Sequence, residues 1–278
     1  MFRVEWLLCH YLVTQPDLDM GDISLKDFDI LSEQDKAEAV ALLSRYEQLD
    51  KQDSCHNDFM GFVKHMWGDT FIEGRHHRII ADKFNRIAQG KLKRLIVCLP
   101  PRHSKSEFTS TFFPAWMMGL NGALKIIQCT HTAELAVRFG RKVRNLIDSE
   151  DFRVIFPKLK LQADNKSAGR WTTNQEGESF YAGVGGAITG RGADLLIIDD
   201  PHKEQDVRAD GKAFEKAMNW YTAGPRQRLQ PGGSIVIVMT RWSTKDITGQ
   251  LLKAQQRKDA EDLIGEAREE LLATAGPT

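Results

Sequence analysis

Short apolar runs alternate with amphipathic stretches over most of this chain. The runs at residues 94–100, 193–198 and 234–240 are apolar almost throughout, and residues 124–130 centre on the apolar pair Ile126 and Ile127. Such runs are typical of strands covered on both sheet faces. Residues 76–90 and 131–148 instead have apolar positions at helical spacing. Buried strands that alternate with helices predict a parallel α/β sheet with helices packed on it.

Start and stop signals refine these helices. Thr132 can cap the helix at 131–148, and Gly90 can end the helix at 76–90. A further helix is expected to begin near Ser104 and to bend or end at Pro114, because proline cannot continue the helical hydrogen-bond ladder.

The N-terminal part is less regular. Residues 1–31 have little periodicity and predict a loosely attached arm. Ser32 and Asp35 have capping-box spacing before an amphipathic helix. The polar residues 50–58 then predict a connector, and residues 59–67 predict another apolar helix.

Composition and charge describe an ordinary globular protein of 278 residues, with 41% hydrophobic and 27% charged residues. Its 38 basic and 38 acidic residues cancel, so any nucleic-acid contact must come from local patches. No apolar run is long enough to span a bilayer. Arg3 and Glu5 interrupt the apolar start and no small-residue cleavage site follows, so no signal peptide is expected.

The cysteines are scattered, which favours reduced thiols in a cytosol over a disulfide framework. They are Cys9, Cys55, Cys98 and Cys129. Two of them precede a histidine, but neither pair has zinc-ligand spacing, so no zinc site is expected.

The segment "RLIVCLPPRHSKSEF", residues 94–108, has the outline of a phosphate-binding (Walker A) loop. In such a loop backbone N–H groups wrap the phosphates, a lysine reaches the terminal phosphates and a hydroxyl binds Mg²⁺. Lys105 and Ser106 hold the last two places, whereas Leu99 and Ser104 stand where the glycines usually are. Taken alone, the motif is equally well a capped helix start with a solvated lysine.

A pair of carboxylates completes the pattern. Asp199 and Asp200 follow the buried run "LLII", at the strand end where α/β ligand sites lie. Magnesium-dependent nucleotide hydrolysis needs one carboxylate for the metal and another for the attacking water. A simple Asp-Asp-Pro turn is the other interpretation. The two motifs together favour a nucleotide hydrolase.

Three further positions could take part. Arg191 stands at the beginning of the strand that ends in Asp199, so it lies at the opposite end of the sheet. It cannot easily reach its own subunit's nucleotide but could act on a neighbouring subunit's, and a loop arginine in structural hydrogen bonds is the other interpretation. Arg102 is the rival arginine finger within the same chain. Thr240 could sense the γ-phosphate, although Ser243 and Asp246 have the spacing of a simple helix cap there.

Arg138, Arg141 and Lys142 share one face of the helix at 131–148. Such a row can contact DNA phosphates without reading sequence. An ordinary solvated helix face has the same pattern.

With these motifs in place, residues 59–252 resemble the ATPase domain of tailed-phage large terminase subunits. The likeness lies in "EGRHHRIIADKFNRIAQGKLKRLIVCLPPRHSKS", "KIIQCTHTAELAVRFGRKVRNLID", "AGVGGAITGRGADLLIIDDPHKEQD" and "IVIVMTRW". It implies an α/β RecA-like P-loop NTPase of the additional-strand type, with a mostly parallel sheet flanked by helices. The expected organisation is an N-terminal arm and helix (1–58), the ATPase domain (59–255) and a helical tail (256–278).

The resemblance also implies roles for individual residues. Lys105 and Ser106 would bind phosphate and Mg²⁺, Asp199 would be the metal-side carboxylate, and Thr240 the coupling residue. Asp200 stands where many relatives have glutamate, so either it or Glu204 would position the water. The implied nucleotide contacts are Pro101, Arg102, His103 and Ser104 of the loop, with His76 and His77 near the adenine.

The activity implied is ATP hydrolysis that drives double-stranded DNA into a procapsid. ATP and Mg²⁺ would be the cofactors. Expected partners are portal protein, a small terminase subunit and further copies of the chain in a ring, in the host cytoplasm and away from membranes. The family usually continues into a metal-dependent nuclease, which residues 256–278 are too short to form, so no nuclease activity is expected.

Other functions remain open at this stage. A helicase-like translocase uses the same two motifs but needs a second motor domain. A small-molecule kinase would need a lid and an acceptor site. A nucleotide-binding scaffold without turnover is compatible with the altered loop and with Asp200.

Overall fold

The computed structural model describes residues 32–188, 190–203 and 212–260. The chain divides into two compact units, one ending at Asn57 and the other beginning at Asp58. The predicted arm at 1–31 and the tail beyond residue 260 lie outside the described residues, and the predicted domain limits stay predictions. Among the described residues, no helix has the length and apolar character to cross a membrane.

The first unit is described by one helix, α3 (Glu33–Asn57). One half of the predicted capping box is present, since Ser32 Oγ accepts the N–H of Asp35 at 3.2 Å, and the same hydroxyl donates to Asp35 Oδ2 at 2.6 Å. The predicted connector at 50–58 is wrong, because α3 continues through this polar run. The run contains neither glycine nor proline, so nothing in it breaks the backbone ladder.

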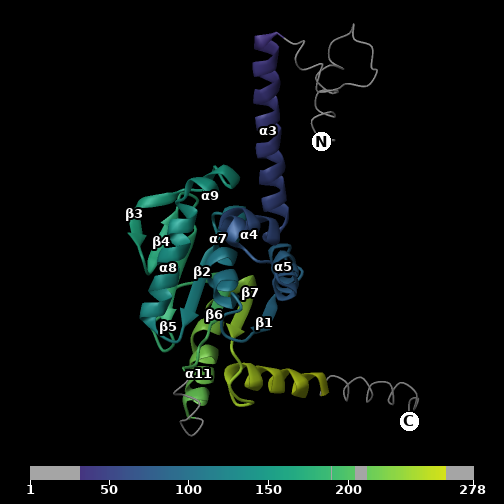
Figure 1. Ribbon diagram of the computed structural model, residues 1–278. Coiled ribbons are helices and arrows are strands. Elements are labelled where there is room, and N and C mark those ends of the chain that lie inside the picture. Colours follow the sequence, from purple (N-terminus) through teal and green to yellow (C-terminus); the bar gives the residue numbers. More distant parts are fainter. Residues whose placement is uncertain (1–31, 189, 204–211, 261–278) are drawn as a thin grey trace, which may run out of the picture. The chain divides into compact units, whose positions relative to one another are not determined.

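The second unit contains a seven-stranded sheet in the order β1-β7-β6-β2-β5-β4-β3 (Figure 1). Its strands are β1 (Arg94–Cys98), β2 (Lys125–Thr130), β3 (Leu161–Ser167), β4 (Arg170–Thr173), β5 (Glu178–Gly183), β6 (Ala193–Asp199) and β7 (Leu229–Met239). From β1 to β5 all neighbours are parallel. Strand β7 lies between β1 and β6, which is the additional-strand order. The predicted mostly parallel α/β fold is confirmed.

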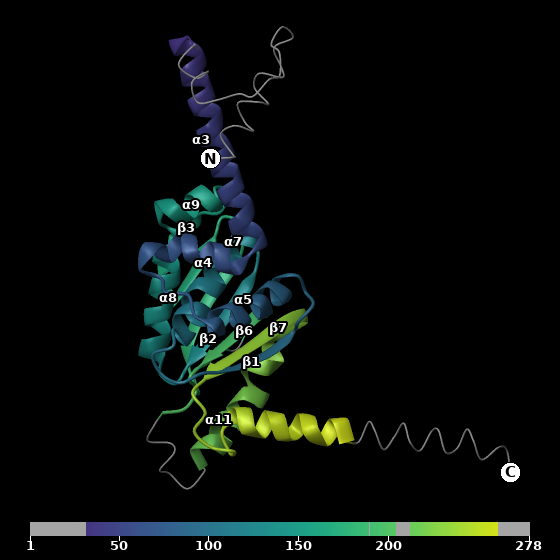
Figure 2. The same cartoon turned by 45° about the vertical axis from the view of Figure 1, so that its right-hand side comes forward.

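Helices cover both faces of this sheet (Figure 1, Figure 2). One layer contains α4 (Phe59–Trp67), α5 (Arg75–Ala88), α6 (Lys105–Glu107), the π-helical turn η2 (Phe108–Phe112), α7 (Phe113–Leu120), α8 (Ala133–Ile147) and α9 (Glu150–Ile155). The other layer contains α11 (Lys212–Ala223) and the helix at residues 247–260. Short 3₁₀ turns are η1 (Gly68–Thr70) and η3 (Pro225–Arg228).

Alternation along the central strands builds two cores. Leu196, Ile198, Ile237 and Met239 pack with Tyr221 of α11 on one face. Successive side chains of a strand point to opposite faces. Leu195, Ile197 and Asp199 alternate with Leu196 and Ile198, so they point to the opposite face, which the layer of α7 and α8 covers.

Two details differ from the sequence prediction. The edge β3–β4–β5 is antiparallel, which buried-run reasoning does not detect because β3 and β4 carry no continuous apolar run. The helix expected to bend or end at Pro114 does not end there. It changes to a π-turn at 108–112, where the N–H of Phe113 bonds to the carbonyl of Phe108, and α7 then begins with Pro114 in its first turn. Proline's missing N–H does no harm in that place.

Candidate active site

The connection from β1 to α6 turns without glycine. Arg102 and Ser104 adopt left-handed backbone conformations, at φ 64° and 57°. Ser104 therefore has the conformation that glycine usually supplies here, at a cost of about 1 kcal/mol. Leu99, at the place of the other glycine, has no such conformation, and its N–H extends the sheet by donating to Met239 O at 3.3 Å. Of the two positions where glycine is usual, only Ser104 has a left-handed backbone.

Lys105 is the first residue of α6, and its side chain is buried. Its Nζ lies 2.9 Å from Oδ2 of Asp200, which directly follows β6. Strands β1 and β6 are not neighbours, because β7 lies between them. The sheet thus brings together the lysine of one predicted motif and a carboxylate of the other across an intervening strand.

Asp199, the last residue of β6, is 1% exposed. Its Oδ2 accepts a hydrogen bond from Ser110 Oγ at 2.7 Å, and its Oδ1 accepts one from Ser106 Oγ at 3.2 Å. Burial, and secondly the neighbouring Asp200 carboxylate, raise the pKa of Asp199 to about 7 despite these hydroxyls. The ionised form is therefore costly in this setting and would be favoured strongly by a bound cation.

Asp200 is held on several sides. Its backbone has φ 42°, a conformation that aspartate tolerates better than most residues. Its Oδ1 accepts the backbone N–H of Thr240 at 2.9 Å, and its carbonyl oxygen lies 3.0 Å from His131 Nδ1. Thr240 Oγ1 in turn donates to Leu99 O at 3.3 Å. Thr240 thus connects the end of β7 to the strand ends on both sides.

Of the two carboxylates proposed for the water, only Asp200 can be compared with this geometry. Glu204 lies outside the described residues. Asp200 is within reach of Lys105 and Thr240, the residues expected at the terminal phosphate.

The histidines expected near the adenine lie beside the loop. His77 is buried, its ring stacks on Phe108 at 4.6 Å, and its Nδ1 accepts the N–H of Gly74 at 3.0 Å. Burial, followed by nearby His76, lowers the pKa of His77 to about 4, so it is a neutral packing group near neutral pH. His76 is the one turned to the loop, with its ring 5.6 Å from that of His103.

The loop tip itself is open to solvent. Pro101, Arg102 and His103 are all exposed, and His103 Nδ1 lies 2.9 Å from Pro101 O. Exposure of Arg102 leaves its cis-finger role a prediction.

Arg191 lies away from these groups, at the opposite edge of the sheet from Asp199, as its place before β6 predicts. Its guanidinium pairs with Glu178 and lies 4.2 Å from the ring centre of Phe180, both in β5. A role toward a neighbouring subunit's nucleotide remains a prediction. For that role Arg191 would have to break its ion pair with Glu178.

Sequence patterns missed two contributors to the site. Ser110 reaches Asp199 because the π-turn changes the helical register, and no local signal marks it. His131 reaches the Asp200 backbone from the end of β2, which only the strand order explains. Of the expected cap pair Ser243 and Asp246, only Asp246 caps the last helix. The last helix begins at 247 and Asp246 caps it, accepting the N–H of Gly249 at 2.8 Å and pairing with Arg241.

The expected basic row on α8 is reduced to two. Arg138 and Arg141 are exposed, but Lys142 pairs with Glu107 of α6. The row therefore begins in solvent and ends on the helix that carries Lys105.

No family model matches the chain. No curated protein matches it. Among solved structures, the large terminase of bacteriophage HK97 is similar over 69% of this chain and 38% of its own, at 11% identity and a TM-score of 0.43. The match thus spans well under half of that terminase.

Proposed function

We propose that this chain hydrolyses ATP with Mg²⁺ and uses the energy to move double-stranded DNA, as the motor of a phage packaging complex. The observation that carries the proposal is the meeting of Lys105, Ser106, Asp199 and Asp200 across β1 and β6. In the simpler interpretation, a turn aspartate and a solvated lysine, Lys105 would be exposed, whereas it is buried and pairs with Asp200.

The residues fit a magnesium nucleotide. Mg²⁺ prefers oxygen ligands and usually binds through one or two protein groups together with waters and phosphates. Ser106 Oγ and the Asp199 carboxylate supply such a pair, 3.2 Å apart. Within the described residues, no three His, Cys, Asp or Glu side chains are arranged to hold a metal by themselves. Most ligands would therefore come from the nucleotide and water.

Each residue has a distinct task in this proposal. Bound Mg²⁺ would neutralise charge developing on the phosphates. Lys105 would exchange Asp200 for phosphate oxygens, which frees the Asp200 carboxylate to orient the attacking water. The N–H of Thr240 donates to Asp200. A change in the position of Asp200 would therefore shift Thr240 and the end of β7 that precedes it.

The partners follow from the sequence resemblance. They are double-stranded DNA, portal protein, a small terminase subunit and a ring of identical subunits in the host cytoplasm, with Arg191 acting between subunits. These assignments are proposals.

One observation favours the non-hydrolysing scaffold as a second candidate. The Lys105–Asp200 ion pair occupies both groups that turnover requires. If this pair does not open, nucleotide could be held without reaction.

The test separates binding from turnover. Affinity for Mg·ATP and the rate of phosphate release would be measured for wild type, Asp200→Asn and Glu204→Gln, with Asp194→Asn at the other end of β6 as control. We expect Asp200→Asn to keep its affinity within a few-fold and to lose turnover by about 10²-fold or more. Unchanged turnover in Asp200→Asn with loss in Glu204→Gln would reassign the water. Binding without turnover in wild type, with DNA and portal present, would establish the scaffold.

A further inference from the structure

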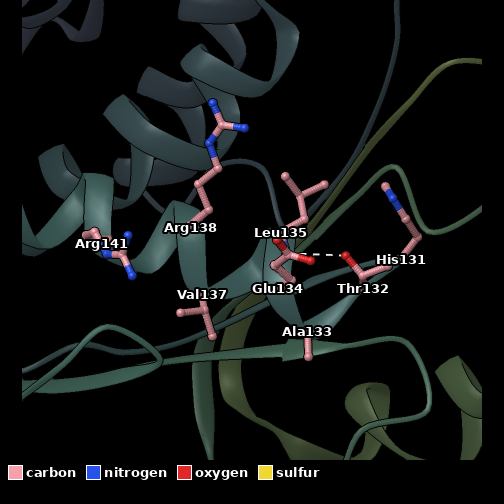
Figure 3. A pocket seen from close by; sticks show the side chains of 8 residues that line it. All are labelled: His131, Thr132, Ala133, Glu134, Leu135, Val137, Arg138 and Arg141. Atoms are coloured by element: carbon pink, nitrogen blue, oxygen red, sulfur yellow. Dashed lines mark hydrogen bonds between the residues drawn. The ribbon is translucent and has the colours of Figure 1, made fainter.

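Two arginines of α8 face solvent. Arg138 and Arg141 are exposed, and neither forms an ion pair with any residue that the structure describes. Glu134 stands four residues before Arg138, the spacing of a helix ion pair, yet Arg138 projects away from it (Figure 3). Both guanidiniums border a recess of about 550 Å³ at the start of α8. Unpaired, open guanidiniums of this kind suit a large anionic partner better than a small enclosed ligand.

The same helix is attached to both halves of the candidate active site. On its next turn Lys142 pairs with Glu107, two residues after Lys105. Just before its first turn His131 Nδ1 lies 3.0 Å from the carbonyl oxygen of Asp200. Force applied to α8 therefore has a route to the phosphate loop and another to the water-side carboxylate.

Helix α8 is also held rigidly against the sheet. Gly140 passes so close to β5 that an added Cβ would lie 2.7 Å from the Tyr181 ring, and its carbonyl accepts a hydrogen bond from Trp171 Nε1 at 3.2 Å. Val143 and Ile147 are fully buried below. A helix fixed in this way moves as a unit rather than bending between its ends.

We propose that Arg138 and Arg141 bind phosphates of duplex DNA, and that α8 transmits this contact to the active site through Lys142–Glu107 and His131–Asp200. The inference rests on the proposed function for its ATP half, whereas the DNA contact can be tested by itself. Guanidinium groups bind phosphate oxygens bidentately and read no bases, so the contact is expected to be independent of sequence. That property suits a surface that meets every part of a moving DNA.

The DNA contact is tested by salt dependence. Binding of a mixed-sequence duplex of about 30 base pairs would be followed by fluorescence anisotropy over a salt series. Each phosphate contact contributes about 0.9 to the slope of log K against log salt. Arg138→Gln/Arg141→Gln is therefore expected to lower the slope by about 2, whereas Lys212→Gln/Lys216→Gln, an exposed pair on α11, leaves it unchanged. Glu134→Gln is expected to bind more tightly than wild type.

Equal slopes for the α8 double variant and its α11 control would overturn the DNA assignment. Tighter binding of duplex RNA than of duplex DNA would overturn it as well. Neither result depends on ATP turnover.

Coupling is tested by a double-mutant cycle on DNA-stimulated ATP hydrolysis. Glu107→Gln is expected to keep the wild-type DNA slope and the basal rate but to lose most of the stimulation by DNA. Adding it to Arg138→Gln/Arg141→Gln should then cause little further loss, because both changes interrupt one route. Fully additive losses would refute the route. Absence of any wild-type turnover would instead count against the proposed function, with the salt slope still deciding the DNA contact.

Discussion

Replacing Asp199 with asparagine should stabilise the fold, and the gain should grow with pH. Asp199 is almost completely buried and its pKa is raised from 3.8 to about 7. A carboxyl whose folded-state pKa is raised contributes stability that is fully present below pH 3.8 and is lost as the pH rises through about 7. Asparagine has nearly the same shape and carries no charge at any of these values, so it avoids this loss.

The magnitude follows from the two pKa values. Each pH unit between these two pKa values lowers the free energy of unfolding by about 1.4 kcal/mol. The free energy of unfolding of wild type therefore falls by about 3 kcal/mol between about pH 5 and about pH 8. That of Asp199→Asn does not fall for this reason. Asparagine cannot accept from both Ser106 and Ser110 as the carboxylate does, which subtracts about 1 kcal/mol at every pH. The variant should therefore be close to wild type at about pH 5 and clearly more stable at about pH 8.

Urea unfolding at both pH values, with EDTA present to remove cations, measures this directly. Taking the difference between variant and wild type cancels the titration of all other groups. Asp194→Asn, on the same strand but less buried, is the matched control for removing a carboxylate from β6. A difference between Asp199→Asn and wild type that stays constant with pH would refute the reasoning, since it would mean that Asp199 is ionised without penalty in the folded chain.

Three further changes test other parts of the structure. Ser104→Gly should raise the free energy of unfolding by about 1 kcal/mol by relieving the left-handed backbone, measured by urea unfolding; a loss of stability would mean that Ser104 is not strained. Gly140→Ala should destabilise the fold by about 2 kcal/mol or more, because the added methyl would lie 2.1 Å from Ala168 O, and unchanged thermal unfolding would contradict this packing. Asp246→Ala should lower stability by about 1–2 kcal/mol by removing the cap of the last helix, most clearly near neutral pH. Hydrogen bonds from Gly249, Ser243 and Trp242 outweigh burial and lower the pKa of Asp246, so this contribution is present above pH 3.8 and fades under acid. A pH-independent effect would argue against the charged cap.

The parts of this fold that could be predicted are those encoded locally. The apolar runs that became β1, β2, β6 and β7 are recognisable because both sheet faces bury them. Lys105 and Asp199 could be assigned to strand ends from their place after such runs.

The rest depends on contacts that are distant in sequence or on weak local preferences. Ser110 faces Asp199 only through a π-turn, and His131 meets Asp200 only because β2 lies next to β6. The polarity of residues 50–58 predicts a connector, yet α3 continues to Asn57, because polarity without glycine or proline does not end a helix. The antiparallel β3–β4 edge carries no buried run for a pattern to detect.

Phosphate release from Mg·ATP by wild type and Lys105→Ala, with and without duplex DNA, tests the central claim most directly. The account predicts turnover by wild type that DNA increases. It also predicts a loss of about 10²-fold or more in Lys105→Ala, because this change removes the buried ammonium that we propose binds the terminal phosphates. Equal rates for the two proteins would contradict it, because hydrolysis would then arise somewhere other than the junction of β1 and β6.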